Sequence, residues 1–325
     1  MLDALHQPVL LEAAIEALHL DPGGSYLDAT FGRGGHARAI YARLGGGGRL
    51  IAIDRDPHAV AFGHALAWRR DDNLACARLD LLQARFAQLG AVLESLGVEA
   101  LDGALFDLGV SSPQLDDPAR GFSFRHDGPI DMRMNPNEGP TARDWLMQSE
   151  VPEISRVLRD YGEERHARAI ALAIEEHRSR LGDAAFQSTA ELAALIRGVI
   201  RRKASGRDEA RDPATRSFQA IRMQVNQELA EIDAGLEQAS QHLKPGGVLA
   251  VISFHSLEDR KVKRFFAEQS GALAQIHPMT GVREHKDWRF EAPRRVLACA
   301  REVQANPRAR SAVLRYARKR RSVEC

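Results

Sequence analysis

Cysteine is scarce in this chain of 325 residues, and the three cysteines, Cys76, Cys299 and Cys325, lie far apart. None forms a Cys-x-x-Cys pair or has the Cys/His spacing of a zinc site. This argues against a disulfide framework and a metal centre and favours a reducing compartment. No apolar run approaches the ~18 residues of a membrane-spanning helix, and the N-terminus lacks a signal-peptide pattern. We therefore expect a cytoplasmic protein with no membrane part.

A large excess of charge of one sign is also absent, because 45 Lys and Arg residues face 44 Asp and Glu residues. The distribution of charge is less even. Eight basic residues lie between Arg197 and Arg222 against three acids, and seven lie between Arg308 and Arg321 with no acid. Local positive patches of this kind suit a nucleic acid. A solvated helix face and a frayed tail would give the same pattern.

Short apolar runs alternate with amphipathic stretches over the first ~110 residues, which is typical of a parallel α/β sheet. Helices are expected between the runs, one of them starting at Pro57 behind Asp56 as its N-cap. The pattern predicts a Rossmann-like doubly wound sheet. Its first four strands are predicted at residues 26–30, 49–54, 74–79 and 101–107.

The pattern changes after residue 110. Residues 111–140 read as an ordered loop, and residues 141–206 have helical spacing, with a capping box at Ser188–Glu191. A long helix over 218–243 and a strand over 248–254 follow, and residues 296–300 and 312–316 are expected to pair as antiparallel strands. We therefore predict a helical substrate-recognition domain inserted into the sheet domain. The predicted boundaries are 1–112 and 213–325 for the sheet domain and 113–212 for the insertion.

A glycine-rich turn, Gly32 to Gly35, stands between the first predicted strand and the following helix. Glycines there allow a tight bend and a close approach of backbone to ligand. Asp54 ends the next strand, where a carboxylate can accept hydrogen bonds from ribose hydroxyls. The pattern suits a nicotinamide dinucleotide nearly as well as S-adenosyl-L-methionine, and a turn without a ligand is a third interpretation.

Two features favour the methyl donor over the dinucleotide. Asp107 ends the fourth strand and Ser111 and Ser112 follow it, at the edge where ligands bind in open α/β sheets. The basic stretches and the helical insertion also suit a large polyanionic substrate better than a small metabolite.

Six motifs, which include the glycine turn, Asp54 and Asp107, follow one another along the chain, and together they resemble the RsmH (MraW) family of bacterial methyltransferases. The resemblance extends from His6 to Arg310. The motifs are Thr30-Phe-Gly-Arg-Gly-Gly-His36, Ile53-Asp-Arg-Asp-Pro57, Asp107-Leu-Gly-Val-Ser-Ser-Pro-Gln-Leu115, Gly121-Phe-Ser-Phe124, Asp131-Met-Arg-Met134 and Ser253-Phe-His-Ser-Leu-Glu-Asp-Arg260.

The resemblance implies a class I S-adenosyl-L-methionine-dependent methyltransferase with an inserted helical domain. It also implies methylation of the N4 amine of one cytidine in 16S rRNA, within the small ribosomal subunit. The cofactor positions that it implies are Gly34, Gly35, His36, Asp54, Phe86, Asp107 and Gln114.

Methyl transfer to a cytosine amine demands alignment and an oxygen acceptor for the amine hydrogens. The candidate catalytic residues are Asp107, Ser111, Ser112, His255 and Asp259. Each has a structural alternative as a turn residue, a buried histidine or a helix-start carboxylate. The Asn/Asp-Pro-Pro-Tyr motif of many amino-methyltransferases is absent. Methylation of carbon 5 is disfavoured, because its cysteine nucleophile is missing from every motif.

The target base must be single-stranded or flipped out of a duplex to reach such a site. Phe122, Phe124, Arg125 and Arg133 in the loop 121–134 could hold that nucleotide, or the aromatic rings could instead fill a domain junction. Two other functions remain open at this point: a nicotinamide-dependent oxidoreductase, and a non-catalytic RNA-binding assembly factor.

Overall fold

The computed structural model describes residues 8–68, 76–203, 212–273 and 288–321. The chain forms two compact units, which we call the sheet unit and the helical unit. The sheet unit comprises Met1–Gly109 and Leu229–Cys325, and the helical unit comprises Val110–Glu228. Within the described residues, no helix has the length and apolar character needed to cross a bilayer.

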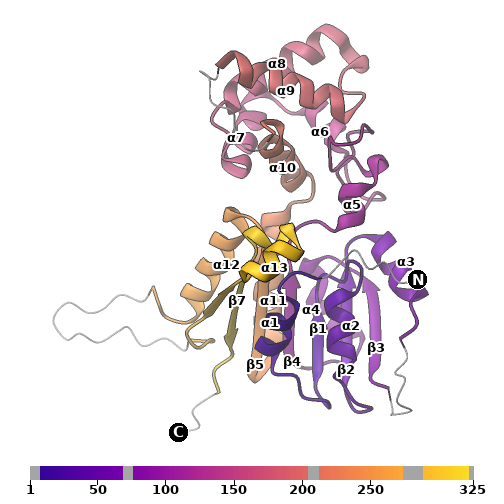
Figure 1. Cartoon of the computed structure of the whole chain (residues 1–325), viewed down its shortest axis with the longest axis vertical. Coiled ribbons are helices and arrows are strands. Elements are labelled where there is room, and N and C mark those ends of the chain that lie inside the picture. The colour runs from indigo at the N-terminus through magenta and orange to yellow at the C-terminus, as the bar shows by residue number, and fades with distance from the viewer. Residues whose placement is uncertain (1–7, 69–75, 204–211, 274–287, 322–325) are drawn as a thin grey trace, which may run out of the picture. The chain divides into compact units, whose positions relative to one another are not determined.

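The sheet unit is built on seven strands in the order β3-β2-β1-β4-β5-β7-β6 (Figure 1). Strands β1 to β5 are parallel, and β7 pairs antiparallel with both β5 and β6. This mixed sheet is typical of class I methyltransferases, so the predicted fold class is confirmed. The strands are β1 Ser25–Asp28, β2 Arg49–Asp54, β3 Arg78–Gln83, β4 Leu101–Asp107, β5 Leu243–Ser253, β6 Arg294–Leu297 and β7 Val313–Arg318.

Helices cover both faces of the sheet. Alternate strand residues point to opposite sides, so each strand contributes to the buried cluster on either face. In β2, Leu50 and Ala52 join one buried cluster with α1 to α3, and Ile51 and Ile53 join the other with α4, α11 and α12. The helices of this unit are α1 Leu11–Leu18, α2 Gly35–Tyr41, α3 Pro57–Ala65, α4 Leu89–Ser95, α11 Glu228–His242, α12 Ser256–Gln269 and α13 Ala300–Ala305, with 3-10 turns η1 Phe86–Gln88 and η4 Pro307–Ser311.

Three predicted elements need correction. The loop expected over 111–140 contains a short helix, α5 Ser112–Asp116, and a 3-10 turn, η2 Pro118–Arg120. The third strand was expected over 74–79, but β3 runs from Arg78 to Gln83, in register with β2 from Arg49 onward; residues 74 and 75 lie outside the described residues. The single helix expected over 218–243 is two helices, because Gln227 has a φ of 54° and ends the helical path after Asn226. The left-handed backbone at Gln227 could not be read from a helical apolar spacing.

The helical unit has its own buried core of aliphatic and aromatic side chains. Its helix α10 packs on α7, where Gly162 leaves room for the backbone of Arg216. The compact unit therefore includes α10 and continues beyond the boundary expected at residue 212. Its elements are α5 Ser112–Asp116, η2 Pro118–Arg120, α6 Ala142–Gln148, α7 Val151–Gly162, α8 Ala167–Leu181, η3 Gly182–Ala184, α9 Thr189–Lys203 and α10 Ala214–Val225.

The loop 121–134 is fixed inside the helical unit by hydrogen bonds. The Asn226 side chain donates to Met132 O and accepts from Met134 N, both at 2.7 Å. Met132 is fully buried with a φ of 59°. Phe122 is buried, and Phe124 packs edge-on against Phe218, 4.8 Å between ring centroids. These contacts favour a packing role for both aromatic rings over a nucleotide-stacking role.

We predict that Asn226→Ala destabilises the helical unit by about 2 to 4 kcal/mol, because one buried and one partly buried backbone group lose their partner. Urea denaturation measures the loss, and amide exchange at Met134 should accelerate. Asn137→Ala, just after the loop in the same unit, is the matched control, since Asn137 is exposed. Equal stabilities of the two variants would contradict this role of Asn226.

Candidate active site

Three carboxylates lie at one edge of the sheet. Asp28, Asp54 and Asp107 are the last residues of β1, β2 and β4, which are neighbouring parallel strands. Parallel strands end at the same edge, so their terminal side chains converge there. The sequence placed Asp54 and Asp107 in the candidate site but missed Asp28, which lies inside the first strand predicted over 26–30 and is the last residue of β1.

The glycine turn after β1 is held against β2 by Asp54. Asp54 Oδ2 accepts from Gly32 N at 2.7 Å, and its Oδ1 accepts from Asp56 N at 2.8 Å. Gly32 and Gly34 have φ values of +52° and +73°, a left-handed conformation that favours glycine. A Cβ on Gly32 would meet nothing closer than 3.9 Å, so this part of the turn is open to a ligand.

Gly35 allows close packing and does not leave space for a ligand on the side where its Cβ would lie. A Cβ at Gly35 would lie 2.2 Å from Pro8 Cγ, so only glycine lets the N-terminal segment close over the start of α2. The N-terminal segment also contacts His36, whose Nε2 lies 3.1 Å from Val9 O. The first helical turn of α2 is therefore fixed by residues that precede α1.

Thr30 connects the ends of β1 and β4. Its backbone N donates to Asp28 Oδ1 at 3.0 Å, and its hydroxyl accepts from Asp107 N at 2.7 Å. Asp107 Oδ1 is buried and has no hydrogen-bond partner among the described residues. A buried carboxylate oxygen without a partner is costly unless a ligand or proton satisfies it.

His36 and Asp107 face each other, with His36 Nδ1 3.5 Å from Asp107 Oδ2. Burial lowers the pKa of His36 to about 4, so the ring is neutral at physiological pH. Because Nε2 donates its proton to Val9 O, Nδ1 presents a lone pair to the carboxyl group. Two facing lone pairs repel, so this geometry favours a protonated Asp107 in the absence of a ligand.

The pKa values of the three carboxyl groups agree with that interpretation. Burial, aided by the charges of Asp28 and Glu258, raises the pKa of Asp107 well above its ordinary value. Burial also raises the pKa of Asp28 to about 7 and that of Asp54 to about 6. Desolvation disfavours each charge, and neighbouring charges add repulsion. Without a bound cation, the acid groups at this edge are therefore not all ionised.

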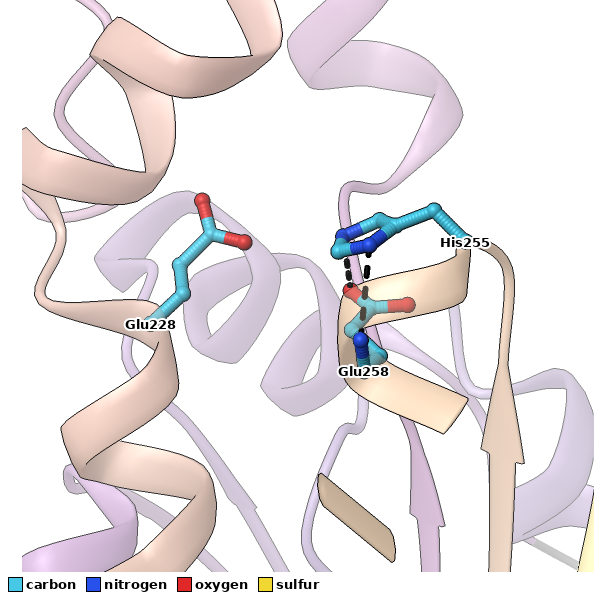
Figure 2. A group of neighbouring side chains, drawn as sticks. All are labelled: Glu228, His255 and Glu258. Atoms are coloured by element: carbon cyan, nitrogen blue, oxygen red, sulfur yellow. Dashed lines mark hydrogen bonds and ion pairs between the residues drawn. The ribbon is translucent and has the colours of Figure 1, made fainter. Parts of the chain in front are cut away.

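Glu258 is a fourth acid near this edge that the sequence interpretation missed. Its side chain is fully buried at the start of α12, and its Oε2 accepts from Phe254 N at 2.9 Å. His255 Nε2 lies 2.9 Å from Glu258 Oε1, and Figure 2 shows the imidazole ring directly against this carboxylate. His255 is thus the N-cap of α12, a position that the sequence interpretation did not assign to it, and it has a buried acid beside it.

Asp259, a candidate for catalysis, is engaged elsewhere. Both of its carboxylate oxygens accept from the Arg315 guanidinium, at 2.7 and 3.0 Å. This bidentate pair joins α12 to β7. The sequence interpretation chose Asp259 and not Glu258. Nothing in the motif shows that an arginine from β7 binds one of these two adjacent acids.

Phe86 follows β3 in the 3-10 turn η1 and is half-buried. Its ring packs edge-on against Phe106 at 5.2 Å between centroids. Gly235 on α11 accommodates it, since a Cβ there would lie 2.7 Å from Phe86 Cβ. Phe86 is thus fixed by the core.

The remaining candidates belong to the helical unit. Gln114 is buried, and its Oε1 accepts from Ser111 N at 2.9 Å across the first turn of α5. Ser112 is buried, and Ser111 is the N-cap of this helix. The structural alternative noted for Ser111, a turn residue, agrees with this local geometry.

The sheet edge combines an open backbone turn, a buried oxygen without a partner and an excess of acid groups. These features suit a ligand that carries positive charge and hydroxyl groups. A pyrophosphate is an anion and would find no positive charge among these acid groups, which argues against a dinucleotide.

Comparison with known proteins agrees with the geometry. The model of the MraW methylase family matches residues 3–320. Among curated relatives, the ribosomal RNA small subunit methyltransferase H of Thiobacillus denitrificans is 52% identical over 97% of this chain and 97% of the relative. The proteins of the same name from Leptothrix cholodnii and Azoarcus sp. are each 49% identical, over 96% of this chain and 92% and 96% of the relatives.

This family consists of methylases, so the oxidoreductase alternative is set aside. A family match over nearly all the chain, together with relatives of about half-identical sequence, establishes that the chain belongs to the MraW methylase family.

Proposed function

We propose that this chain transfers a methyl group from S-adenosyl-L-methionine to the N4 amine of a cytidine in 16S rRNA of the small ribosomal subunit. The observation that carries the proposal is the acid-rich sheet edge beside an open glycine turn, in a chain of the MraW methylase family. The relatives named for methylation of small-subunit ribosomal RNA support the substrate.

The donor is bound, in this proposal, by the sheet edge. Gly34, Gly35 and His36 form the wall beside its methionine part, Asp54 accepts from the ribose hydroxyls, and Phe86 lies against the adenine. The buried Asp107 Oδ1, which has no partner among the described residues, fits a cationic group of the donor. Gln114 is proposed as a further polar contact on the resemblance alone.

The bound donor supplies an electrophilic methyl group on a sulfonium. The chain must hold the cytosine N4 in line with that methyl, so that the N–C bond forms as the C–S bond breaks. N4 then loses a proton, and an oxygen acceptor stabilises the charge that develops on the amine. Asp107 is our first candidate for that acceptor, because Asp259 is occupied by Arg315. His255, Ser111 and Ser112 remain candidates.

The inserted helical unit is proposed to recognise the RNA around the target cytidine, which must be unstacked to reach the donor. The rival function is an RNA-binding assembly factor without catalysis. The two differ in one measurable respect, because only an enzyme turns over the donor.

The first test is transfer itself. Incubation with labelled S-adenosyl-L-methionine and small subunits from cells that lack the activity should label the RNA, and mass mapping should place N4-methylcytidine at one position. Fully methylated subunits serve as the control and should accept no label. A complete lack of transfer to any ribosomal RNA would leave only the assembly-factor interpretation.

Asp107→Asn should weaken donor binding by about 10- to 100-fold, because a charge-assisted hydrogen bond contributes about 1.5–3 kcal/mol. The affinity of the unchanged protein should rise with pH. Its folded-state Asp107 pKa is raised, so a proton held at low pH must leave before a cation binds, and the variant should lose much of this dependence. Calorimetry between pH 5.5 and 8.5 measures both effects.

Asp160→Asn on α7, an exposed position in the helical unit, is the matched control and should bind the donor as the unchanged protein does. The role of Asp107 is refuted if its variant keeps both the affinity and the pH dependence.

A further inference from the structure

Arginines are concentrated where the chain returns to the sheet for its last strand. Between β6 and β7 lie α13 and η4, residues 300–311, which we call the carboxyl-edge ridge. Arg301, Arg308 and Arg310 are exposed on it, and Glu302 is its only acid. Glu302 Oε1 is directed inward, since it accepts from Leu10 N at 2.6 Å. The ridge thus presents positive charge with little opposing charge.

The position of the ridge follows from the strand register. Val313, the first residue of β7, pairs with Ser253, the last residue of β5. The residues just before β7 therefore lie at the carboxyl edge of the parallel strands, where Asp28, Asp54 and Asp107 also end. Figure 1 shows α13 at that end of the sheet unit.

A second link ties the ridge to the candidate site. Leu10 N donates to Glu302, and Val9 O, one residue earlier, contacts His36. Val303 and Ala309 of the ridge pack in the same cluster as α1 and α2. The ridge is therefore fixed to the segment that holds His36 and does not hang free from the sheet.

The structure divides the basic C-terminal stretch into two groups. The first is used inside the fold: Arg315 binds Asp259, Arg318 donates to Gly246 O, and Lys319 donates to backbone carbonyls at the end of α11 and the start of β5. Arg310 in this stretch, and Arg301 earlier on the ridge, have no hydrogen-bond or ion-pair partner within the described residues. Both side chains are therefore available to a ligand.

We propose that the carboxyl-edge ridge binds the phosphate backbone of the RNA substrate through Arg301 and Arg310, next to the donor site. The inference rests on the proposed function and adds a contact surface on the sheet unit. Guanidinium groups suit phosphate oxygens because they can donate two parallel hydrogen bonds. The ridge carries no exposed large apolar side chain that would insert into a lipid surface.

The test compares two neutralised double variants. Arg301→Gln/Arg310→Gln removes two charges from the ridge. Arg43→Gln/Arg78→Gln removes two charges from exposed arginines at the opposite edge, where α2 has ended and β3 begins. Binding to unmodified 16S rRNA transcript is measured by filter retention across a salt series. Methylation of small subunits and calorimetric binding of S-adenosyl-L-methionine are measured in parallel.

The ridge variant should bind the transcript about tenfold more weakly, with a salt slope smaller by about 0.7 to 0.9 for each lost phosphate contact. Its KM for small subunits should rise, while its kcat at saturation and its affinity for the donor stay unchanged. The opposite-edge variant should match the unchanged protein in all five quantities.

If the ridge variant has the same RNA affinity and salt slope as the opposite-edge variant, the ridge does not bind RNA. That result would leave the proposed methylation intact. Weaker binding to subunits but not to naked transcript would also overturn RNA binding by the ridge, because it would indicate a ribosomal protein as the partner. Failure of the unchanged protein to methylate any ribosomal RNA would instead refute the proposed function.

Discussion

The central physical constraint in this protein is the burial of several acid groups at one edge of its sheet. Asp28, Asp54 and Asp107 converge there because β1, β2 and β4 are parallel neighbours, and Glu258 adds a further buried charge. Ionising all of them without a ligand would carry a large desolvation and repulsion cost. Protons held at raised pKa values relieve that cost in the free protein. A cationic ligand would relieve the same cost, so the physical chemistry of this edge favours a positively charged ligand.

The surrounding structure keeps these acids in place through short local contacts. Asp54 holds the glycine turn, Thr30 connects Asp28 to the backbone of Asp107, and Val9 fixes His36. Each contact joins segments that follow different strands or precede the first one. The candidate site is therefore assembled only when the sheet has formed, although most of its residues stand in a few short motifs. Preorganised donors and acceptors of this kind need little rearrangement when a ligand binds.

The strands that apolar runs predict are largely present, since burial on both faces leaves a clear trace in β2, β4 and β5. The sequence was less informative where long-range contacts determine the bounds of an element or the partner of a side chain. β3 lies later than its apolar run suggested, because pairing with β2 sets its register. Gln227 divides a helical pattern by backbone conformation alone. Asp259 and Glu258 are equivalent in sequence, and only Arg315, 56 residues further on, distinguishes them.

The same limit applies to charge patterns. A count of basic residues does not distinguish those that form ion pairs within the fold from those that are free to bind a ligand. Arg197 and Arg222 bind Asp212 and Glu228 within the helical unit, just as Arg315 binds Asp259 in the sheet unit. Such pairs neutralise the field that the linear sequence suggests. What remains at the sheet edge is a sharp contrast over a short distance: a buried acidic site that favours a cation, and an exposed basic ridge that favours a polyanion. A sulfonium donor and an RNA acceptor have these opposite charges, so one edge can attract both reactants while keeping them in separate places.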